Sequence, residues 1–181
     1  MSVKITYFVH GTTTDNEQHI SSGWKDVGLS TLGIQQSKDL KEETKDKKFD
    51  VVFCSDLQRA KRSAELAWGD LYAIIPDARL RECSYGDLNG GPSSIVEPMQ
   101  EHNFSTKFPK GESYDDVKAR IADFLSMLKR DYEGKHVALV AHKAPQLSLE
   151  VLLNGLTWQE ASERDWRKRK TWQPGWEYVI A

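Results

Sequence analysis

The 181-residue chain has little cysteine and no long apolar run, and both absences restrict the classes of protein it can belong to. Its two cysteines, Cys54 and Cys83, are too few for a disulfide framework, so we expect them to be buried thiols in a reducing compartment. No apolar stretch approaches the ~18 residues of a membrane-spanning helix. The amino-terminal residues also lack the apolar core and small-residue cleavage site of a secretion signal. We therefore expect a cytoplasmic protein with no membrane partner.

An excess of charge of one sign is also lacking. The 25 Lys and Arg residues nearly balance the 27 Asp and Glu residues, for a net charge of −2. This balance gives no general reason to bind nucleic acid, and together with 39% hydrophobic residues it argues against disorder. The length fits a single domain over residues 1–181. It predicts no particular oligomeric state.

Strand-like and helix-like runs alternate along the chain, which is typical of an α/β fold with a mostly parallel sheet. Short apolar runs predict strands at 3–9, 49–54, 71–75, 135–141 and 176–180. Helical spacing predicts helices at 31–44, 56–68, 145–153, after the cap residue Ser113 and after the cap residue Thr157. A polar loop is expected at 12–28. Weak periodicity with several Gly and Pro predicts an irregular cap or lid at about 79–111.

Two of these helices carry more detailed predictions. The helix at 31–44 is predicted because Leu29, Leu32, Gln36 and Leu40 recur at helical spacing. In the helix at 56–68, Ser55 and Gln58 have the spacing of a capping box.

Polar residues follow three predicted strands at their carboxyl ends. These are His10-Gly11, Ser55 with Arg59 one turn later, and His142-Lys143. Ligands of open α/β sheets bind at this edge, so we expect His10, Arg59 and His142 to face one crevice. Two histidines and an arginine near helix amino termini favour an anion, and the several oxygens of phosphate suit several donors.

These residue types fit phosphoryl transfer. A neutral imidazole is nucleophilic near pH 7 and can form a phosphohistidine that water then releases. The planar fork of Arg59 suits two phosphate oxygens. The leaving oxygen also needs a proton donor. Glu82 lies in the irregular segment that can reach the crevice, with Asp87 as the fallback.

Five motifs in order resemble the histidine phosphatase superfamily, the phosphoglycerate-mutase-like proteins. They are FVHGTTTDN at 8–16 with its continuation at 23–35, SDLQRA at 55–60, LRECSYGDLNG at 80–90, GES at 111–113 and VAH at 140–142. The resemblance covers nearly the whole chain. It implies a doubly wound, mostly parallel sheet with helices on both faces, and a reaction that needs no metal or other cofactor.

The resemblance also implies roles for individual residues. His10 is the phosphorylated nucleophile, His142 the second pocket histidine and Glu82 the general acid or base. Arg59 and Asn16 contact the phosphoryl group. Gly11 and Thr13 keep family positions beside the nucleophile and are further candidates for phosphate binding.

The sequence departs from the family pattern at two positions. Val9 stands where the family has a phosphate-binding arginine. Losing one charge-assisted hydrogen bond predicts phosphate binding weaker by about ten- to a hundredfold. Lys143 stands where the family usually has glycine. We consider two interpretations of Lys143: it partly replaces the lost charge, or it is a solvated surface residue.

The predicted function is hydrolysis of a small phosphorylated metabolite through phosphohistidine. The alternatives are phosphoryl transfer of the phosphoglycerate-mutase type and a weakened, non-catalytic member that only binds phospho-ligands. The tail mixes tryptophans with a basic run at 164–170, and we expect a charged helix that borders the crevice.

Overall fold

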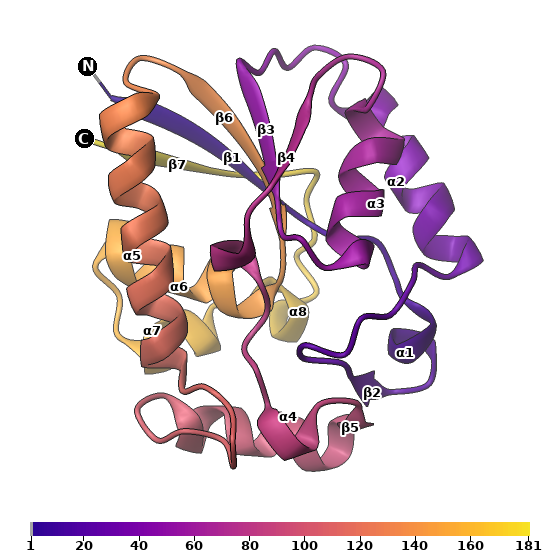
Figure 1. Ribbon diagram of the computed structural model, residues 1–181, viewed down its shortest axis with the longest axis vertical. Coiled ribbons are helices and arrows are strands. Elements are labelled where there is room, and N and C mark those ends of the chain that lie inside the picture. Colours follow the sequence, from indigo (N-terminus) through magenta and orange to yellow (C-terminus); the bar gives the residue numbers. More distant parts are fainter. Residues whose placement is uncertain (1) are drawn as a thin grey trace.

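The computed structural model describes residues 2–181 and has the expected α/β architecture. Its main sheet has the strand order β4-β3-β6-β1-β7. The strands are β1 (Val3–Val9), β3 (Val51–Cys54), β4 (Ile74–Pro76), β6 (His136–Ala141) and β7 (Trp176–Ile180). All neighbouring strands pair in parallel except β7, which runs antiparallel to β1 at the edge (Figure 1).

Helices cover both faces of this sheet, because alternate residues of the central strands face opposite sides. On one face, Val137 and Leu139 of β6 pack against α5 (Tyr114–Asp131) and α6 (Lys143–Asn154). On the other face, Ala138 and Val140 pack against α2 (Thr31–Glu43) and α3 (Gln58–Trp68). The doubly wound arrangement is therefore confirmed.

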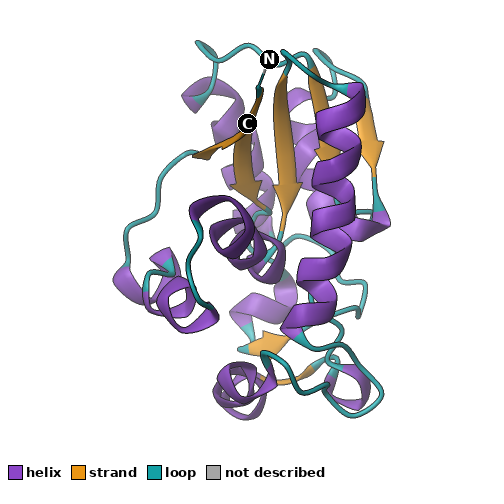
Figure 2. Ribbon diagram, turned by 90° about the vertical axis from the view of Figure 1, so that its left-hand side faces the viewer, coloured by secondary structure: helices purple, strands orange, loops and turns teal. Residues whose placement is uncertain are grey.

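The smaller elements lie beyond the carboxyl ends of the parallel strands (Figure 2). Helix α1 (Thr14–Glu17) and strand β2 (Ile20–Ser21) interrupt the predicted polar loop, and β2 pairs with β5 (Gly91–Pro92). The segment at 79–111 is more ordered than its sequence indicated. It contains α4 (Ser93–Gln100) and, with its flanks, three 3-10 turns, at Ala78–Leu80, Gly86–Leu88 and Glu101–Asn103.

Two helices show details that their sequences did not indicate. In α2, Leu32 is 53% exposed, and the buried residues are Gly33, Ser37 and Leu40. The small Gly33 is buried there because the helix approaches another backbone closely. Helix α3 begins two residues later than expected. The predicted Ser55–Gln58 capping box is wrong, because Leu57 is the N-cap residue and Asp26 accepts the hydrogen bond from the Gln58 N–H.

Other predicted boundaries are confirmed closely. Strands β1 and β7 match their predicted ranges, whereas β4 begins three residues later and includes Pro76. Ser113 caps α5, and Thr157 caps α7 (Trp158–Glu163). A short helix α8 (Trp166–Arg169) follows. Within residues 2–181, no helix combines the length and apolar character needed to cross a membrane.

Candidate active site

The carboxyl ends of the central strands open into a cavity of about 940 Å³. Val9 pairs with Ala141 in the register of β1 and β6, so the next residues of the two strands, His10 and His142, emerge side by side. The cavity brings together all eight residues that the sequence singled out: His10, Gly11, Thr13, Asn16, Arg59, Glu82, His142 and Lys143.

His10 is oriented by a backbone carbonyl. Its Nδ1 lies 2.7 Å from the Gly11 oxygen. Because a carbonyl only accepts, Nδ1 carries the hydrogen in this arrangement and Nε2 keeps its lone pair. Burial, followed by the charge of Arg59, lowers the pKa of His10 to about 3. A neutral ring with a free Nε2 is the form of histidine that acts as a nucleophile.

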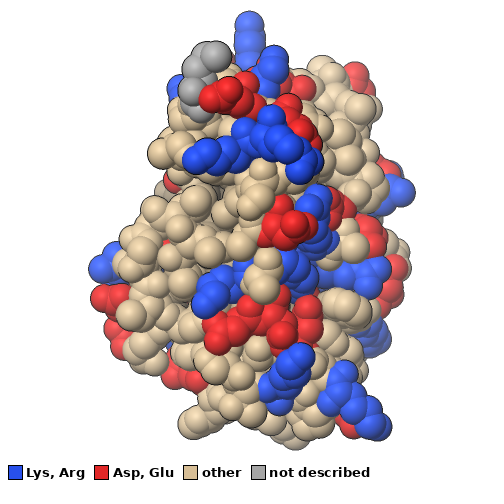
Figure 3. Space-filling model, turned by 60° about the vertical axis from the view of Figure 1, so that its left-hand side comes forward, with Lys and Arg blue, Asp and Glu red and all other residues tan. Residues whose placement is uncertain are grey.

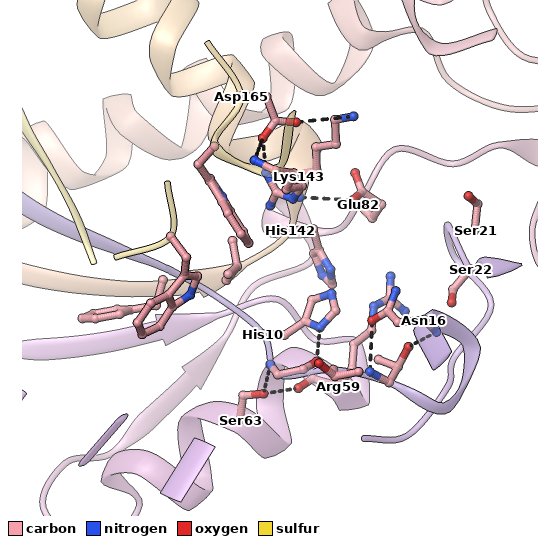
Figure 4. A pocket seen from close by; sticks show the side chains of 18 of the residues that line it. His10, Asn16, Ser21, Ser22, Arg59, Ser63, Glu82, His142, Lys143 and Asp165 are labelled. Atoms are coloured by element: carbon pink, nitrogen blue, oxygen red, sulfur yellow. Dashed lines mark hydrogen bonds and ion pairs between the residues drawn. The ribbon is translucent and has the colours of Figure 1, made fainter. Parts of the chain in front are cut away.

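His142 faces His10, with ring centroids 5.0 Å apart (Figure 4). His142 is 1% exposed, and neither of its ring nitrogens has a hydrogen-bond partner within the described chain. Such unpaired buried nitrogens are costly unless a ligand satisfies them. The Tyr7 hydroxyl donates to the His142 carbonyl at 2.6 Å and holds this backbone in place.

Arg59 reaches the cavity from the first turns of α3. It is 3% exposed, and its Nη1 and Nη2 donate to the carbonyls of Lys25 and Gly23. These two bonds use only part of its five donors. Ser63, one turn later, donates to the Arg59 carbonyl and accepts the Gly11 N–H, and so connects α3 to the loop that follows His10. Ser63 was not predicted as a site residue from the sequence. The available signal was its position four residues after Arg59, on the same face of the helix.

Glu82 is held at the amino end of α6. Its Oε1 accepts the N–H groups of Cys83 and Ala144, and its Oε2 accepts the Lys143 N–H. The first N–H groups of α6 are therefore not free to bind a ligand, because Glu82 already engages them. Each carboxylate oxygen has two lone pairs, so Oε2 retains capacity for one more hydrogen bond.

The segment that carries Glu82 is fixed by Arg120 of α5. Arg120 donates to the carbonyls of Arg79, Arg81 and Glu82, and its guanidinium pairs with both oxygens of Glu112. No sequence pattern indicated this contact. The fallback residue Asp87 does not line the cavity and pairs instead with Lys110.

Asn16 and Thr13 form a capping box at the start of α1. The Asn16 Oδ1 accepts the Thr13 N–H at 3.0 Å, which leaves the Asn16 amide nitrogen as an available donor. The Thr13 Oγ1 accepts the Asn16 N–H, while its own hydroxyl hydrogen remains to donate. Gly11 donates its N–H to Ser63 and orients His10 through its carbonyl.

Lys143 extends across the mouth of the cavity. Its Nζ donates to Gln100 Oε1 at 2.8 Å and lies 3.5 Å from Asp165 Oδ2. The tail therefore does border the crevice: Asp165, Trp166, Arg167 and Lys168 all line the cavity. The sequence predicted that this segment borders the crevice, but it did not indicate Asp165 or Arg167 as site residues.

Both cysteines lie outside the cavity lining. They are free and buried, and burial raises the pKa of the Cys54 thiol to about 12. As expected from the sequence, they are packed as core residues.

Comparison with known proteins agrees with this geometry. The profile of the histidine phosphatase superfamily (branch 1) matches residues 7–171. A 2,3-bisphosphoglycerate-dependent phosphoglycerate mutase from Methylobacterium sp. (strain 4-46) is 31% identical over 82% of this chain and 79% of its own. The uncharacterized phosphatase PhoE of Bacillus subtilis (strain 168) is 30% identical over 87% of this chain and 88% of its own.

Solved structures show the same fold. Mycobacterial hydrolase 1 superposes with a TM-score of 0.81 at 24% identity, covering 90% of this chain and 85% of the other. A mycobacterial glucosyl-3-phosphoglycerate phosphatase in complex with VO3 gives a TM-score of 0.78 at 25% identity, covering 90% and 86%. The sequence match over nearly the whole chain and the paired cavity histidines lead to one conclusion: this protein belongs to the histidine phosphatase superfamily.

Proposed function

We propose that this protein hydrolyses a small phosphomonoester through a phosphohistidine at His10. One observation carries the proposal: the free Nε2 of His10 faces His142, whose two buried ring nitrogens lack partners in the described chain. A phosphoryl group between the rings offers its phosphorus to His10 Nε2 and one of its oxygens to a ring nitrogen of His142. The proposed reaction needs no metal ion or other cofactor, and we place it in the cytoplasm.

In the first step, His10 Nε2 attacks phosphorus. The new P–N bond forms as the bond from phosphorus to the substrate oxygen breaks, and that oxygen leaves with the electron pair. Glu82, protonated at this stage on Oε2, donates its proton to the leaving oxygen. The alcohol departs and Glu82 becomes a carboxylate.

In the second step, water attacks the phosphohistidine. Glu82 accepts a proton from this water, the P–N bond breaks, and inorganic phosphate leaves with His10 neutral again. One water is consumed and Glu82 regains its proton, so the cycle is closed.

The remaining pocket residues bind phosphoryl oxygens in this proposal. Arg59 supplies a buried guanidinium, Asn16 its amide nitrogen and Thr13 its hydroxyl. Gly11 contributes to this binding by aligning His10. Lys143 lines the same cavity, where its charge partly offsets the missing arginine at position 9.

The test compares the intact chain with His10→Ala on 4-nitrophenyl phosphate in the presence of a chelator. Exposed His102 supplies a matched control, His102→Ala, because it lies outside the cavity lining. We expect turnover by the intact chain and the control and none by His10→Ala. A brief incubation with labelled substrate should trap an acid-labile phosphoprotein that depends on His10.

Other outcomes separate the alternatives. Chelator-sensitive turnover, or turnover retained by His10→Ala, contradicts the proposed mechanism. Transfer of the trapped phosphoryl group to a phosphoglycerate in preference to water would indicate a mutase, which the Methylobacterium relative makes the second candidate. Phosphate binding without any turnover would indicate a binding protein.

A further inference from the structure

A phosphomonoester is close to a dianion at neutral pH, and the two cavity histidines bring little charge to meet it. Burial, together with the charge of Arg59, lowers the pKa of both His10 and His142, so the rings act as neutral groups. Positive charge must therefore come from arginine or lysine. On the face shown in Figure 3, basic and acidic side chains interleave, so this face is not uniformly basic.

Four cationic side chains line this cavity, namely Arg59, Lys143, Arg167 and Lys168. Lys168 is engaged at the rim, where its Nζ donates to Glu101 and to Ser162. The Lys143 ammonium donates to Gln100 and also pairs with Asp165. Arg59 approaches from α3. Arg167 approaches from α8 and the carboxyl-terminal tail, which is a separate part of the chain.

Arg167 is held firmly but only along one edge of its guanidinium. Its Nη1 donates to Asp165 Oδ1 at 2.9 Å and to Gln146 Oε1 at 3.4 Å. The guanidinium carbon stacks 4.6 Å from the Trp166 ring centroid, and the Trp166 indole itself donates to Gln146. Within residues 2–181, its Nε–H and Nη2–H groups form no hydrogen bond. These free donors form the fork that binds two oxygens of one phosphate.

Asp165 is the anchor of this arrangement. Its side chain is 1% exposed, with one oxygen on Arg167 and the other 3.5 Å from the Lys143 ammonium. That second oxygen has no hydrogen bond within the described chain. A buried carboxylate is stable only with compensating charge, so Asp165 holds both cations at the cavity. Lys143 and Arg167 share this one carboxylate, so the three side chains together carry one net positive charge.

We propose that Arg167 is a second phosphate-binding guanidinium of this active site, placed there by Asp165. Arg59 comes from α3 and Arg167 from α8 in the carboxyl-terminal tail, and both line the cavity that holds the two histidines. In this arrangement Arg167 supplies the fork that Val9 lacks, and Lys143 adds a point charge. The inference rests on the proposed function, because it assigns a role at the same phosphoryl site.

The test measures the affinity of inorganic phosphate for the full chain by calorimetry, with no turnover required. We compare the intact chain with Arg167→Ala, Arg167→Lys and the matched control Arg164→Ala. Arg164 is exposed and lies three residues earlier, outside the cavity lining. Loss of one charge-assisted contact should weaken phosphate binding by about ten- to a hundredfold in Arg167→Ala. The phosphate affinity of Arg167→Lys should fall between those of the intact chain and Arg167→Ala, and the affinity of Arg164→Ala should equal that of the intact chain.

A double-mutant cycle tests the positioning role of Asp165. Asp165→Asn should weaken phosphate binding in the intact background and cause a smaller further loss when Arg167 is already alanine, because only the pair with Lys143 is then left to disturb. A purely structural role would give the same loss in both backgrounds. If Asp165→Asn does not fold, the partial loss expected for Arg167→Lys still tests the fork.

The outcomes separate this inference from the proposed function. Phosphate bound by Arg167→Ala as tightly as by the intact chain overturns the inference, even if turnover is present. Absence of phosphate binding by the intact chain overturns it as well. Arg167-dependent phosphate binding without hydrolysis supports the inference and contradicts the proposed function instead.

Discussion

At the scale of single residues, the site depends on which atoms are already engaged. The Gly11 carbonyl uses Nδ1 of His10, and three backbone N–H groups use most of the acceptors of Glu82. What remains free is His10 Nε2 and one lone pair on Glu82 Oε2. The sequence predicted the residue types and their meeting at one edge, because polar residues that follow parallel strands share that edge. It did not determine the free atoms.

The first residue-scale prediction concerns Glu82 as the proton donor. Glu82→Gln should lower kcat/KM for an alkyl phosphomonoester by about 10²- to 10⁴-fold, the usual contribution of general acid catalysis. The loss for 4-nitrophenyl phosphate should be much smaller, since 4-nitrophenolate leaves without a proton. Steady-state kinetics on both substrates measures the difference.

This comparison is protected from a folding artefact. Any disturbance caused by the amide among the backbone N–H groups affects both substrates equally. Asp87→Asn is the control, because Asp87 is exposed to solvent beside Lys110 and lies outside the cavity lining. Equal losses on the two substrates would argue against proton donation by Glu82.

At the scale of elements, close backbone contact positions the loop that follows His10. Gly33 in α2 lies against Thr12, and Gly11 lies against Gly33. A Cβ at Gly33 would meet the Thr12 carbonyl oxygen at 1.9 Å. The apolar spacing that predicted this helix gave no indication of this contact, because a pattern of apolar residues carries no signal for an interface made of backbone. The predicted capping of α3 was wrong for a similar reason. The Gln58 N–H donates to Asp26, which lies in a loop that is distant in the sequence.

We expect Gly33→Ala to destabilise the protein. In an ordinary helix interior this change stabilises by ~1 kcal/mol. Here the overlap with Thr12 should instead lower the free energy of unfolding by about 1–3 kcal/mol, as overpacking does. The change should also lower kcat/KM, because it displaces the loop that carries His10.

Gly28→Ala is the matched control, because the nearest atom to its Cβ would be the Gln58 side-chain oxygen at 3.7 Å. Urea unfolding of the three proteins gives the comparison. A Gly33→Ala protein that is more stable than the intact chain would contradict the close approach.

At the scale of the whole molecule, the site makes stability depend on pH. Burial lowers the pKa of both His10 and His142 in the folded state, whereas histidine in the unfolded chain titrates near ~6.5. Below that pH the unfolded state binds more protons than the folded state. Stability therefore falls as the pH falls from about 6.5, by up to about 1.4 kcal/mol per pH unit for each histidine.

Urea unfolding between pH 7.5 and 5.5 tests this prediction, because most carboxylates remain ionised across that range. His10→Asn should give a shallower pH dependence than the intact chain, and His102→Asn, which alters an exposed residue outside the cavity lining, should leave it unchanged. Stability that is constant over this range would show that the two rings are charged or well solvated in the folded protein.

The sequence by itself determined the α/β order, the family and the meeting of His10, Arg59, Glu82 and His142. Those features depend on local periodicity and on motifs that lie in one stretch of chain. Only the tertiary structure decided the orientation of His10, the Arg120 contacts that hold the Glu82 segment, and the arrival of Asp165 and Arg167 at the cavity. The contacts of Arg120 and the pair between Lys143 and Asp165 join separate elements through single side chains, whereas His10 is oriented by the carbonyl of its neighbour Gly11. Their strength depends on burial and exact donor geometry, which no local pattern records.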